Sequence, residues 1–263
     1  MSLYQSLAEI EARGDSAVVC TIIESSGSTP RHQDSRMIVY PDGQFTGSVG
    51  GGEVESRVLA EAKIVFTDGH SRVFHYDLVD PGRGDPGICG GSVTVYLEPI
   101  LPKPCVVVIG GGHVGKAVAH LAKWLGFRVV VSDDRPELCT PEANPDADEF
   151  YPIPMEDLPK HLQINSQTYL VLTTRGMNVD VPGVPALLDT AAGYIGIIGS
   201  RRRWVMSKKG MIEAGVTQEK IESIHSPIGL EIGAETPEEI AVSIMAEIIM
   251  IRNGGSGKSM KIN

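Results

Sequence analysis

A glycine-rich segment near the middle of the chain has the residue types that bind a dinucleotide. Its motif, G-x-G-x-x-G, consists of Gly110, Gly112 and Gly115, and it stands between the apolar run Cys105–Ile109 and a helical pattern. In such a motif the first glycine permits a tight turn, the second lets the backbone approach a pyrophosphate, and the third allows the helix to pack on the strand. The phosphates would then meet the N–H groups at the start of the helix. The segment predicts a dinucleotide-type fold.

An acidic residue stands where the ribose of such a ligand would lie. Asp133 ends the next apolar strand, 18 positions after Gly115. A carboxylate at this point accepts hydrogen bonds from ribose hydroxyls, which favours NAD over a ligand with a 2′-phosphate. Asp134 takes this role if the alignment shifts by one residue, and the neighbouring Arg135 weakens the discrimination. The alternative interpretation is that the two acids only cap a turn.

His113 lies inside the glycine turn, where its ring could face a phosphate. No second histidine or cysteine stands at the spacing of a metal ligand, so we expect no metal there. The alternative is a solvated loop side chain.

A basic segment follows the predicted apolar strand 194–199. The segment runs from Gly199 to Arg203, and the residues we single out in it are Ser200, Arg201 and Arg202. Open α/β sheets bind ligands at the carboxyl ends of their strands, and arginine offers a forked set of donors for phosphate or carboxylate. The alternative is the basic start of a surface helix.

Two loops in the first hundred residues have the chemistry of an anion-binding nest. They combine small residues, many N–H donors and a nearby cation, and the residues we single out are Ser28, Thr29 and Arg31 in one loop and Gly50, Gly51 and Gly52 in the other. Each loop alone is as easily a structural turn. Two such loops within one small domain favour a binding function.

Cys89 is the candidate reactive thiol, because it lies between glycines in a Pro/Gly-rich loop. Cys20 and Cys105 lie in apolar strands and are expected to be inert core residues. The four cysteines form no C-x-x-C pair and no zinc-type spacing. This scatter suits a reducing cytoplasm.

Length and charge limit the function classes. The 263 residues suffice for two domains, and the net charge of −10 argues against a general affinity for nucleic acid or for an anionic membrane. The N-terminus lacks a signal-peptide pattern, and the longest apolar tract is too short to span a bilayer. We expect a cytoplasmic protein.

The expected elements form an α/β protein with two domains. A small N-terminal α+β domain, 1–102, precedes a Rossmann-like domain with a doubly wound parallel sheet, 103–253, and a flexible tail, 254–263; the boundary is the proline-rich segment 101–104. In the first domain we predict helices at 3–13 and 53–66, and strands at 17–24, 37–40, 44–46, 71–78 and 92–99. In the second we predict strands at 105–109, 127–134, 169–174 and 194–199, and helices at 116–124, from Pro185 and from Thr236.

The set of motifs resembles one protein family. Nearly the whole chain takes part, through the segments Ser26–Arg31, Gly47–Glu55, Ile88–Gly91 before Val95–Pro99, Gly110–Gly115 with Asp133–Pro136, Tyr194–Arg202, and Ile228–Glu239. In these segments the chain is similar to the xanthine dehydrogenase accessory proteins of the XdhC/CoxI family.

The resemblance implies an assembly role in place of steady turnover. Proteins of this family bind molybdenum cofactor as cargo, assist its sulfuration with a cysteine desulfurase, and deliver it to xanthine dehydrogenase or a related hydroxylase. Cys89 would lie near the molybdenum or its sulfur, and NAD(P) is a further candidate ligand at the Rossmann site. A second copy of the chain is a further candidate partner.

Two positions depart from the family pattern. Some branches carry a cysteine after the second glycine loop, where this chain has Glu53, so Cys89 becomes the better thiol candidate. Many members carry a histidine where this chain has Arg175. Two other functions remain open: an NAD-dependent oxidoreductase, and a nucleotide-binding redox sensor without chemistry.

Overall fold

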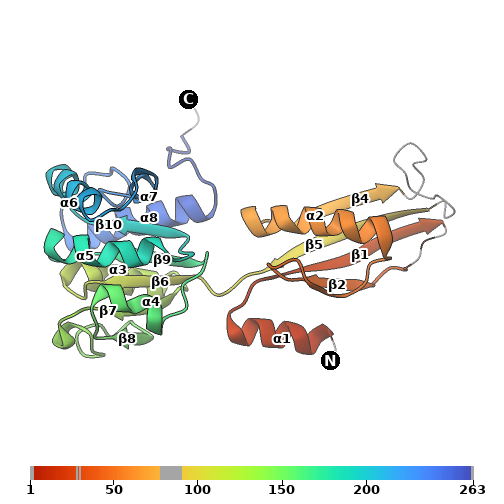
Figure 1. Ribbon diagram of the computed structural model, residues 1–263, viewed down its shortest axis with the longest axis horizontal. Helices are drawn as coiled ribbons and strands as arrows, with labels where there is room; N and C mark the ends of the chain where they lie inside the picture. Colours follow the sequence, from red (N-terminus) through yellow and green to blue (C-terminus); the bar gives the residue numbers. More distant parts are fainter. Residues whose placement is uncertain (1–2, 28, 30, 78–90, 262–263) are drawn as a thin grey trace. The chain divides into compact units, whose positions relative to one another are not determined.

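The chain forms two compact units, Met1–Pro102 and Lys103–Asn263. Each unit has its own five-stranded sheet and its own hydrophobic core. The computed structural model describes residues 3–27, 29, 31–77 and 91–261 (Figure 1). Among these residues no helix is both long and apolar enough to cross a lipid bilayer.

The first unit is built on an antiparallel sheet. Its strands are β1 (Ala17–Gly27), β2 (Arg36–Val39), β3 (Phe45–Gly47), β4 (Arg72–Asp77) and β5 (Gly91–Ile100), in the order β3-β2-β1-β5-β4. Buried and half-buried residues alternate along β5, because successive side chains of a strand point to opposite faces.

Two helices cover the two faces of this sheet. The helix α2 (Gly52–Asp68) buries Val54, Val58, Ala62 and Val65, a stripe at helical spacing that packs against Val93, Val95 and Leu97 of β5. The helix α1 (Leu3–Arg13) packs Ile10 on the other face, against Ala17, Val19 and Ile38. The unit is therefore an α+β domain.

The second unit is built on a parallel sheet. Its strands are β6 (Cys105–Ile109), β7 (Arg128–Ser132), β8 (Glu149–Tyr151), β9 (Thr168–Leu172) and β10 (Tyr194–Ile197), in the order β10-β9-β6-β7-β8. Every neighbouring pair is parallel. The order of the strands reverses beside β6, so β6 and β9 meet at the switch point where Rossmann sheets bind ligands.

Helices cover both faces of the parallel sheet, as the short apolar strands require. Val106 and Val108 of β6 face a core shared with α3 (His113–Trp124) and α8 (Pro237–Arg252). Val107 and Ile109 face a second core, shared with α4 (Leu158–His161), α5 (Met177–Leu188), α6 (Arg201–Glu213) and α7 (Gln218–Glu222). The predicted fold class, with a doubly wound parallel sheet, is confirmed.

The prediction of a helix from Pro185 is wrong. Helix α5 begins eight residues earlier, at Met177, and contains both Pro182 and Pro185. Its buried residues Asp180, Gly183, Val184 and Leu187 have helical spacing. Packing of this face against the sheet therefore outweighs the cost of two prolines inside the helix.

Candidate functional site

The turn between β6 and α3 has little free space on its protein side. Gly110 has a φ of +113°, and a Cβ atom there would lie 2.6 Å from the carbonyl oxygen of Thr173. A Cβ on Gly115 would lie 2.0 Å from the carbonyl oxygen of Gly110. Around a Cβ on Gly112, in contrast, nothing lies within 4 Å. Packing requires the first and third glycines of the motif, whereas the second faces open space.

Helix α3 begins without a side-chain cap. Gly112 is its N-cap residue, and the first backbone bond of the helix runs from Lys116 N to Gly112 O at 2.8 Å. The N–H groups of a first turn have no acceptor within their own helix. Together with the helix dipole they offer an anion site beside the open face of Gly112.

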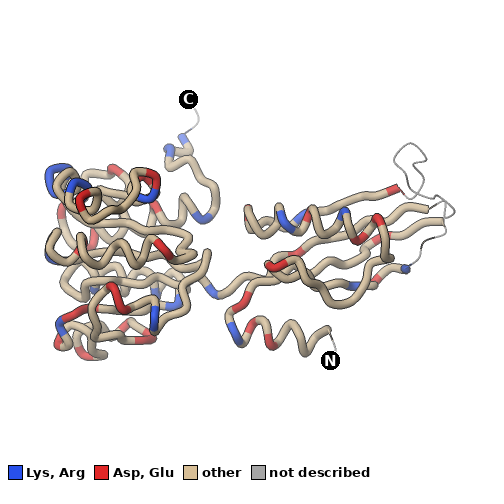
Figure 2. Tube along the Cα trace, viewed as in Figure 1, with Lys and Arg blue, Asp and Glu red and all other residues tan. Residues whose placement is uncertain are grey.

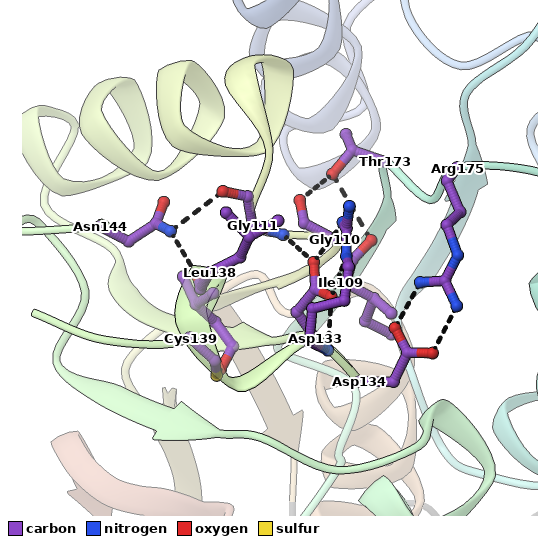
Figure 3. Close-up of polar contacts among 12 residues, drawn as sticks. Ile109, Gly110, Gly111, Asp133, Asp134, Leu138, Cys139, Asn144, Thr173 and Arg175 are labelled. Atoms are coloured by element: carbon purple, nitrogen blue, oxygen red, sulfur yellow. Dashed lines mark hydrogen bonds and ion pairs between the residues drawn. The ribbon is translucent and has the colours of Figure 1, made fainter. Parts of the chain in front are cut away.

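The backbone of Gly111 is held both at its N–H and at its carbonyl oxygen (Figure 3). Its N–H donates to Asp133 Oδ2 at 2.8 Å, and its carbonyl oxygen accepts from Asn144 Nδ2 at 3.1 Å. Asn144 is buried and also donates to Leu138 O at 2.8 Å. The sequence analysis missed Asn144, because nothing local marks an asparagine 33 positions away as part of this turn.

The carboxylate of Asp133 is fully occupied by protein donors. Its Oδ1 accepts from the backbone N and Nε of Arg135 at 3.0 and 2.9 Å, and its Oδ2 accepts from Arg135 Nη2 and Gly111 N, both at 2.8 Å. The Asp133 side chain is 2% exposed. A carboxylate offers about four lone-pair positions. A ribose hydroxyl would therefore have to compete with Arg135 or with the Gly111 N–H for this carboxylate.

Asp134 forms a bidentate ion pair with Arg175. The guanidinium donates through both Nη atoms, with Nη2 at 2.6 Å from Oδ2. These hydrogen bonds lower the pKa of Asp134 and raise the pKa of Arg175. The partners follow β7 and β9, the strands on either side of β6, so the pair joins two loops at the carboxyl edge of the sheet.

A cavity of about 260 Å³ opens at this edge. Its walls come from the ends of β6, β7 and β9, from the segment after β8 and from α5, and they include Gly110, Ser132, Asp133, Asp134, Arg135, Glu156, Thr174, Arg175 and Asn178. Ser132 is fully buried, and its Oγ has no hydrogen-bond partner among the described residues. A buried hydroxyl without a partner marks a place where a ligand or water atom is expected.

In the basic segment after β10, some side chains make hydrogen bonds that stabilise the fold and others are exposed to solvent. Ser200 caps α6 by accepting from Arg203 N at 3.2 Å. Arg203 belongs to the predicted basic segment but was not among its predicted site residues. It donates from Nη2 to Asp180 Oδ2 at 2.7 Å and to Thr174 Oγ1 at 2.8 Å. The carboxylate of Asp180 is completely buried. Buried charge is stable only when paired, so this network fixes α6 to the β9–α5 loop.

Arg201 and Arg202 stay exposed at the start of α6, where Figure 2 shows basic residues gathered. Arg201 lines a second cavity, of about 570 Å³, with the segment 227–234. His113 lies apart from both cavities described so far. It lines a groove of about 430 Å³ between α3 and α8, together with Lys116 and His120. The structure therefore places the His113 side chain beside α8 and not in the cavity of Asp133 and Asp134.

The glycine loop of the first unit is open. Gly51 and Gly52 have φ angles of +76° and +57°, and nothing lies within 4 Å of a Cβ built on either. Ser48 Oγ accepts weakly from Gly50 N at 3.3 Å and donates to Glu55 Oε1 at 2.6 Å, so the loop is tied to the first turn of α2. The open backbone retains the character expected of an anion-binding loop.

The other loop of the first unit is described only in part. Thr29 Oγ1 donates to Arg31 O at 2.8 Å, and the Arg31 side chain is exposed. Ser28 and Cys89 lie outside the described residues. Among the described residues, no group of three or more histidine, cysteine or acidic side chains could hold a metal ion.

The described cysteines are buried thiols. Burial raises the pKa of Cys20 to about 12 and that of Cys105 to about 11. It also raises the pKa of Cys139, whose Sγ donates to Val131 O at 3.2 Å. A thiol with a raised pKa is a poor nucleophile at neutral pH. Cys20, Cys105 and Cys139 therefore fit a structural role.

Two family models match the chain. Residues 106–248 match the XdhC Rossmann domain, and residues 10–77 match the XdhC and CoxI family.

Among curated proteins, the "Uncharacterized protein YqeB" of Escherichia coli (strain K12) is 33% identical over 99% of this chain and 48% of its own length. A probable xanthine dehydrogenase subunit of Bacillus subtilis (strain 168) is 34% identical over 61% of this chain and 47% of its own length. The chain thus spans about half the length of these two relatives. The "Molybdenum cofactor insertion chaperone PaoD" of Escherichia coli (strain K12) is 25% identical over 91% of this chain and 84% of its own length.

A solved structure has a similar fold. A crystal structure described as a xanthine dehydrogenase from Bacillus halodurans covers 99% of this chain and 98% of its own, with a TM-score of 0.51 and 24% identity. At this identity the likeness shows the fold alone.

Proposed function

Because the chain belongs to the XdhC and CoxI family, we propose that it is an accessory protein for a xanthine dehydrogenase-type molybdoenzyme. In this role it binds molybdenum cofactor, assists its sulfuration and supports its insertion into the enzyme. The observation that carries the proposal is the match of both units to models of this family. The similarity to an insertion chaperone over 91% of this chain supports the insertion step.

The glycine loops supply the anion-binding chemistry that this role requires. Molybdenum cofactor carries a phosphate, which open backbone N–H groups and a helix N-terminus can bind. The uncapped start of α3 and the open Gly51–Gly52 backbone both have this character. We assign a nucleotide to the Rossmann unit and leave the loops of the first unit to the cofactor.

Sulfuration also needs a group that holds the metal end of the cofactor or its sulfur. The thiols of Cys20, Cys105 and Cys139 are buried. Cys89 is the remaining cysteine of the chain, and we propose it for this contact. A cysteine desulfurase is the proposed sulfur donor.

An oxidoreductase fits the described site less well. Hydride transfer to a carbonyl needs a proton donor, most often histidine, although a carboxylic acid, lysine or tyrosine also serves. Among the described residues that line the 260 Å³ cavity only carboxyl groups are of these types, and Asp133 and Asp134 are held as carboxylates by Arg135 and Arg175, which leaves Glu156. We therefore favour the accessory role over a dehydrogenase.

The test combines binding with cofactor transfer. Purified protein is titrated with molybdenum cofactor, with Cys89→Ala beside wild type and Cys105→Ala as the matched control for loss of a thiol. We expect binding by wild type and control, and weaker binding by Cys89→Ala. In parallel, a xanthine dehydrogenase with unsulfurated cofactor should regain activity faster with cysteine desulfurase when this protein is present. No cofactor binding and no effect on reactivation would refute the proposal.

A further inference from the structure

Asp133 is a poor partner for an ordinary ribose diol, because all of its lone-pair positions are used by Arg135 and Gly111. Freeing one would break a charge-assisted hydrogen bond to a buried carboxylate, either from Arg135 or from the Gly111 peptide that shapes the turn. Asp134, the other acid at this cavity, accepts from Arg175 through both of its oxygens, so a diol would have to share that carboxylate with a guanidinium. The geometry therefore disfavours the usual recognition of NAD.

Two cations stand at the same cavity. Arg135 and Arg175 both line it, and both side chains are partly exposed. Hydrogen bonds to Asp133 raise the pKa of Arg135, while the nearby positive charge of Arg175 acts in the opposite direction. Two guanidinium groups close enough to repel each other favour an anion near both.

Asp134 at present supplies that anion. It accepts from both Nη atoms of Arg175, and the positive charge of Arg135 also helps to lower its pKa. Its side chain is 34% exposed and that of Arg175 is 42% exposed. Ion pairs this exposed contribute little to stability, so a phosphate with more acceptor oxygens can displace the carboxylate.

The cavity wall holds a further donor for such a ligand. The hydroxyl of Ser132 is fully buried at the end of β7 and has no partner among the described residues. Ser132 is among the residues that line the same cavity as the two arginines, with its hydroxyl buried behind the cavity surface. A hydroxyl group donates readily to a phosphate or ribose oxygen, which would satisfy this buried group.

We propose that this cavity selects a nucleotide whose adenosine ribose carries a 2′-phosphate, as in NADP, over one with a free 2′-hydroxyl, as in NAD. The inference rests on the nucleotide role proposed above for the Rossmann unit. Arg135 and Arg175 bind the phosphate, and Asp134 holds its place in the free protein. The selection reverses the preference for NAD that the sequence motif predicted.

Calorimetric titration of the full-length protein tests the selection with four probes: NADP⁺, NAD⁺, 2′,5′-ADP and 5′-AMP. We expect each 2′-phosphorylated probe to bind at least about tenfold more tightly than its unphosphorylated counterpart, because a guanidinium–phosphate contact is charge-assisted. The preference should decrease as salt is raised. Equal or tighter binding of NAD⁺ would overturn the proposal.

Variants distinguish two roles of the Asp134–Arg175 ion pair: one in which a bound phosphate displaces Asp134, and one in which the pair only stabilises the fold. Arg175→Ala should abolish most of the preference for NADP⁺. Asp134→Asn should strengthen NADP⁺ binding and leave NAD⁺ binding nearly unchanged, because it frees Arg175. Glu156→Gln is the matched control, since it removes a negative charge from the same cavity wall without freeing an arginine. If Asp134→Asn weakens NADP⁺ binding as Arg175→Ala does, the pair is structural and the proposal fails.

The experiments can contradict the NADP⁺ selectivity and the accessory role independently of each other. Selective NADP⁺ binding, without binding of molybdenum cofactor and without any effect on reactivation, supports the inference and refutes the accessory role. Binding of molybdenum cofactor without binding of any of the four probes keeps the accessory role and removes the inference.

Discussion

The glycines of the G-x-G-x-x-G motif have two different roles at the turn after β6: two are required for packing and one leaves space for a ligand. Gly110 and Gly115 are required by close backbone contacts, whereas Gly112 keeps the approach to α3 open. Packing and binding can therefore be separated by single substitutions at neighbouring positions.

Gly115→Ala should destabilise the second unit strongly, because its Cβ would lie 2.0 Å from a backbone oxygen that cannot move freely. We expect a loss of about 3 kcal/mol in the free energy of unfolding. Gly112→Ala should cost less than about 1 kcal/mol but weaken nucleotide binding, since the added methyl group occupies the open face. Urea denaturation and calorimetry measure the two effects. Equal loss of stability in both variants would contradict this division.

The chemistry of the turn could be predicted from the sequence, but the state of its acid could not. The spacing of the glycines and the adjoining strand and helix follow from local pattern. The saturation of Asp133 depends on how Arg135 folds back and on where the Gly111 N–H points. These are consequences of tertiary geometry, and they are the basis of the proposed preference for a 2′-phosphorylated nucleotide.

At the scale of elements, α6 is positioned by one buried network. Arg203 reaches from α6 to Asp180 on α5 and to Thr174 after β9. The hydrogen bonds of this network join the loop after β9, helix α5 and helix α6. Its loss would release the start of α6, where Arg201 and Arg202 lie.

Arg203→Met should cost about 3–5 kcal/mol in the free energy of unfolding, because it leaves the buried carboxylate of Asp180 without its cation. Lys209→Met on the same helix is the control, since its ion pair with Glu213 is long, at 3.8 Å, and exposed. That variant should change stability by less than about 0.5 kcal/mol. Denaturation curves with equal midpoints for the two variants would contradict the importance of the network.

A second buried carboxylate ties α8 to the loop that precedes it. Glu247 accepts from Tyr194 Oη and from Gly229 N at 2.9 Å, and His225 Nδ1 lies 3.6 Å away. Burial acts to raise the pKa of Glu247, but the interaction with His225 and the hydrogen bonds from Tyr194 and Gly229 outweigh it and leave the pKa lowered. The Tyr194 pKa is raised, by burial and by the adjacent carboxylate.

The lowered pKa of Glu247 makes its contribution dependent on pH. A depressed folded-state pKa stabilises the protein above the unfolded value, about 4.5, and the stabilisation is lost as pH falls through the folded-state pKa. Glu247→Gln should therefore cost about 1–3 kcal/mol near neutral pH, and this cost should shrink in strong acid. Urea denaturation across this range measures it, with Glu213→Gln as an exposed control. A cost independent of pH would contradict the assignment.

Elements with strong local signals could be predicted, and those fixed by packing could not. Helix α8 begins at the capping box of Thr236 and Glu239, which the sequence shows directly. Helix α5 could not be placed, because Pro185 imitates a helix start while the buried face of the helix extends back to Met177. The strand β8 has only three residues, too few for a visible alternation.

At the scale of the molecule, each unit has a complete core, and the chain passes from one to the other between β5 and β6. The apolar residues of the first core come from β1, β2, β4, β5, α2 and, with Val49, the loop before α2, all within Met1–Pro102. The two cores of the parallel sheet use residues after Lys103 alone. Each of these cores, as far as the described residues show, is built from the residues of one unit.

Fragments 1–102 and 103–263 should therefore fold independently when they are expressed separately. We expect cooperative thermal unfolding for each by circular dichroism, and nucleotide binding by the second alone. Moving the cut to residue 90 should abolish folding of the first fragment, because β5 pairs with both β1 and β4. A first fragment that folds without β5 would contradict this boundary.

The two hydrogen bonds that hold the backbone of Gly111 affect the free energy of ligand binding. Asp133 and Asn144 hold its N–H and its carbonyl oxygen before any ligand arrives. The turn is preorganised, so capture costs it little conformational entropy. Its amide proton should also exchange slowly with solvent, while those of the uncapped first turn of α3 exchange quickly. The turn is thus a rigid template beside exposed amides, and a bound phosphate would slow the exchange of those amides while leaving that of Gly111 unchanged.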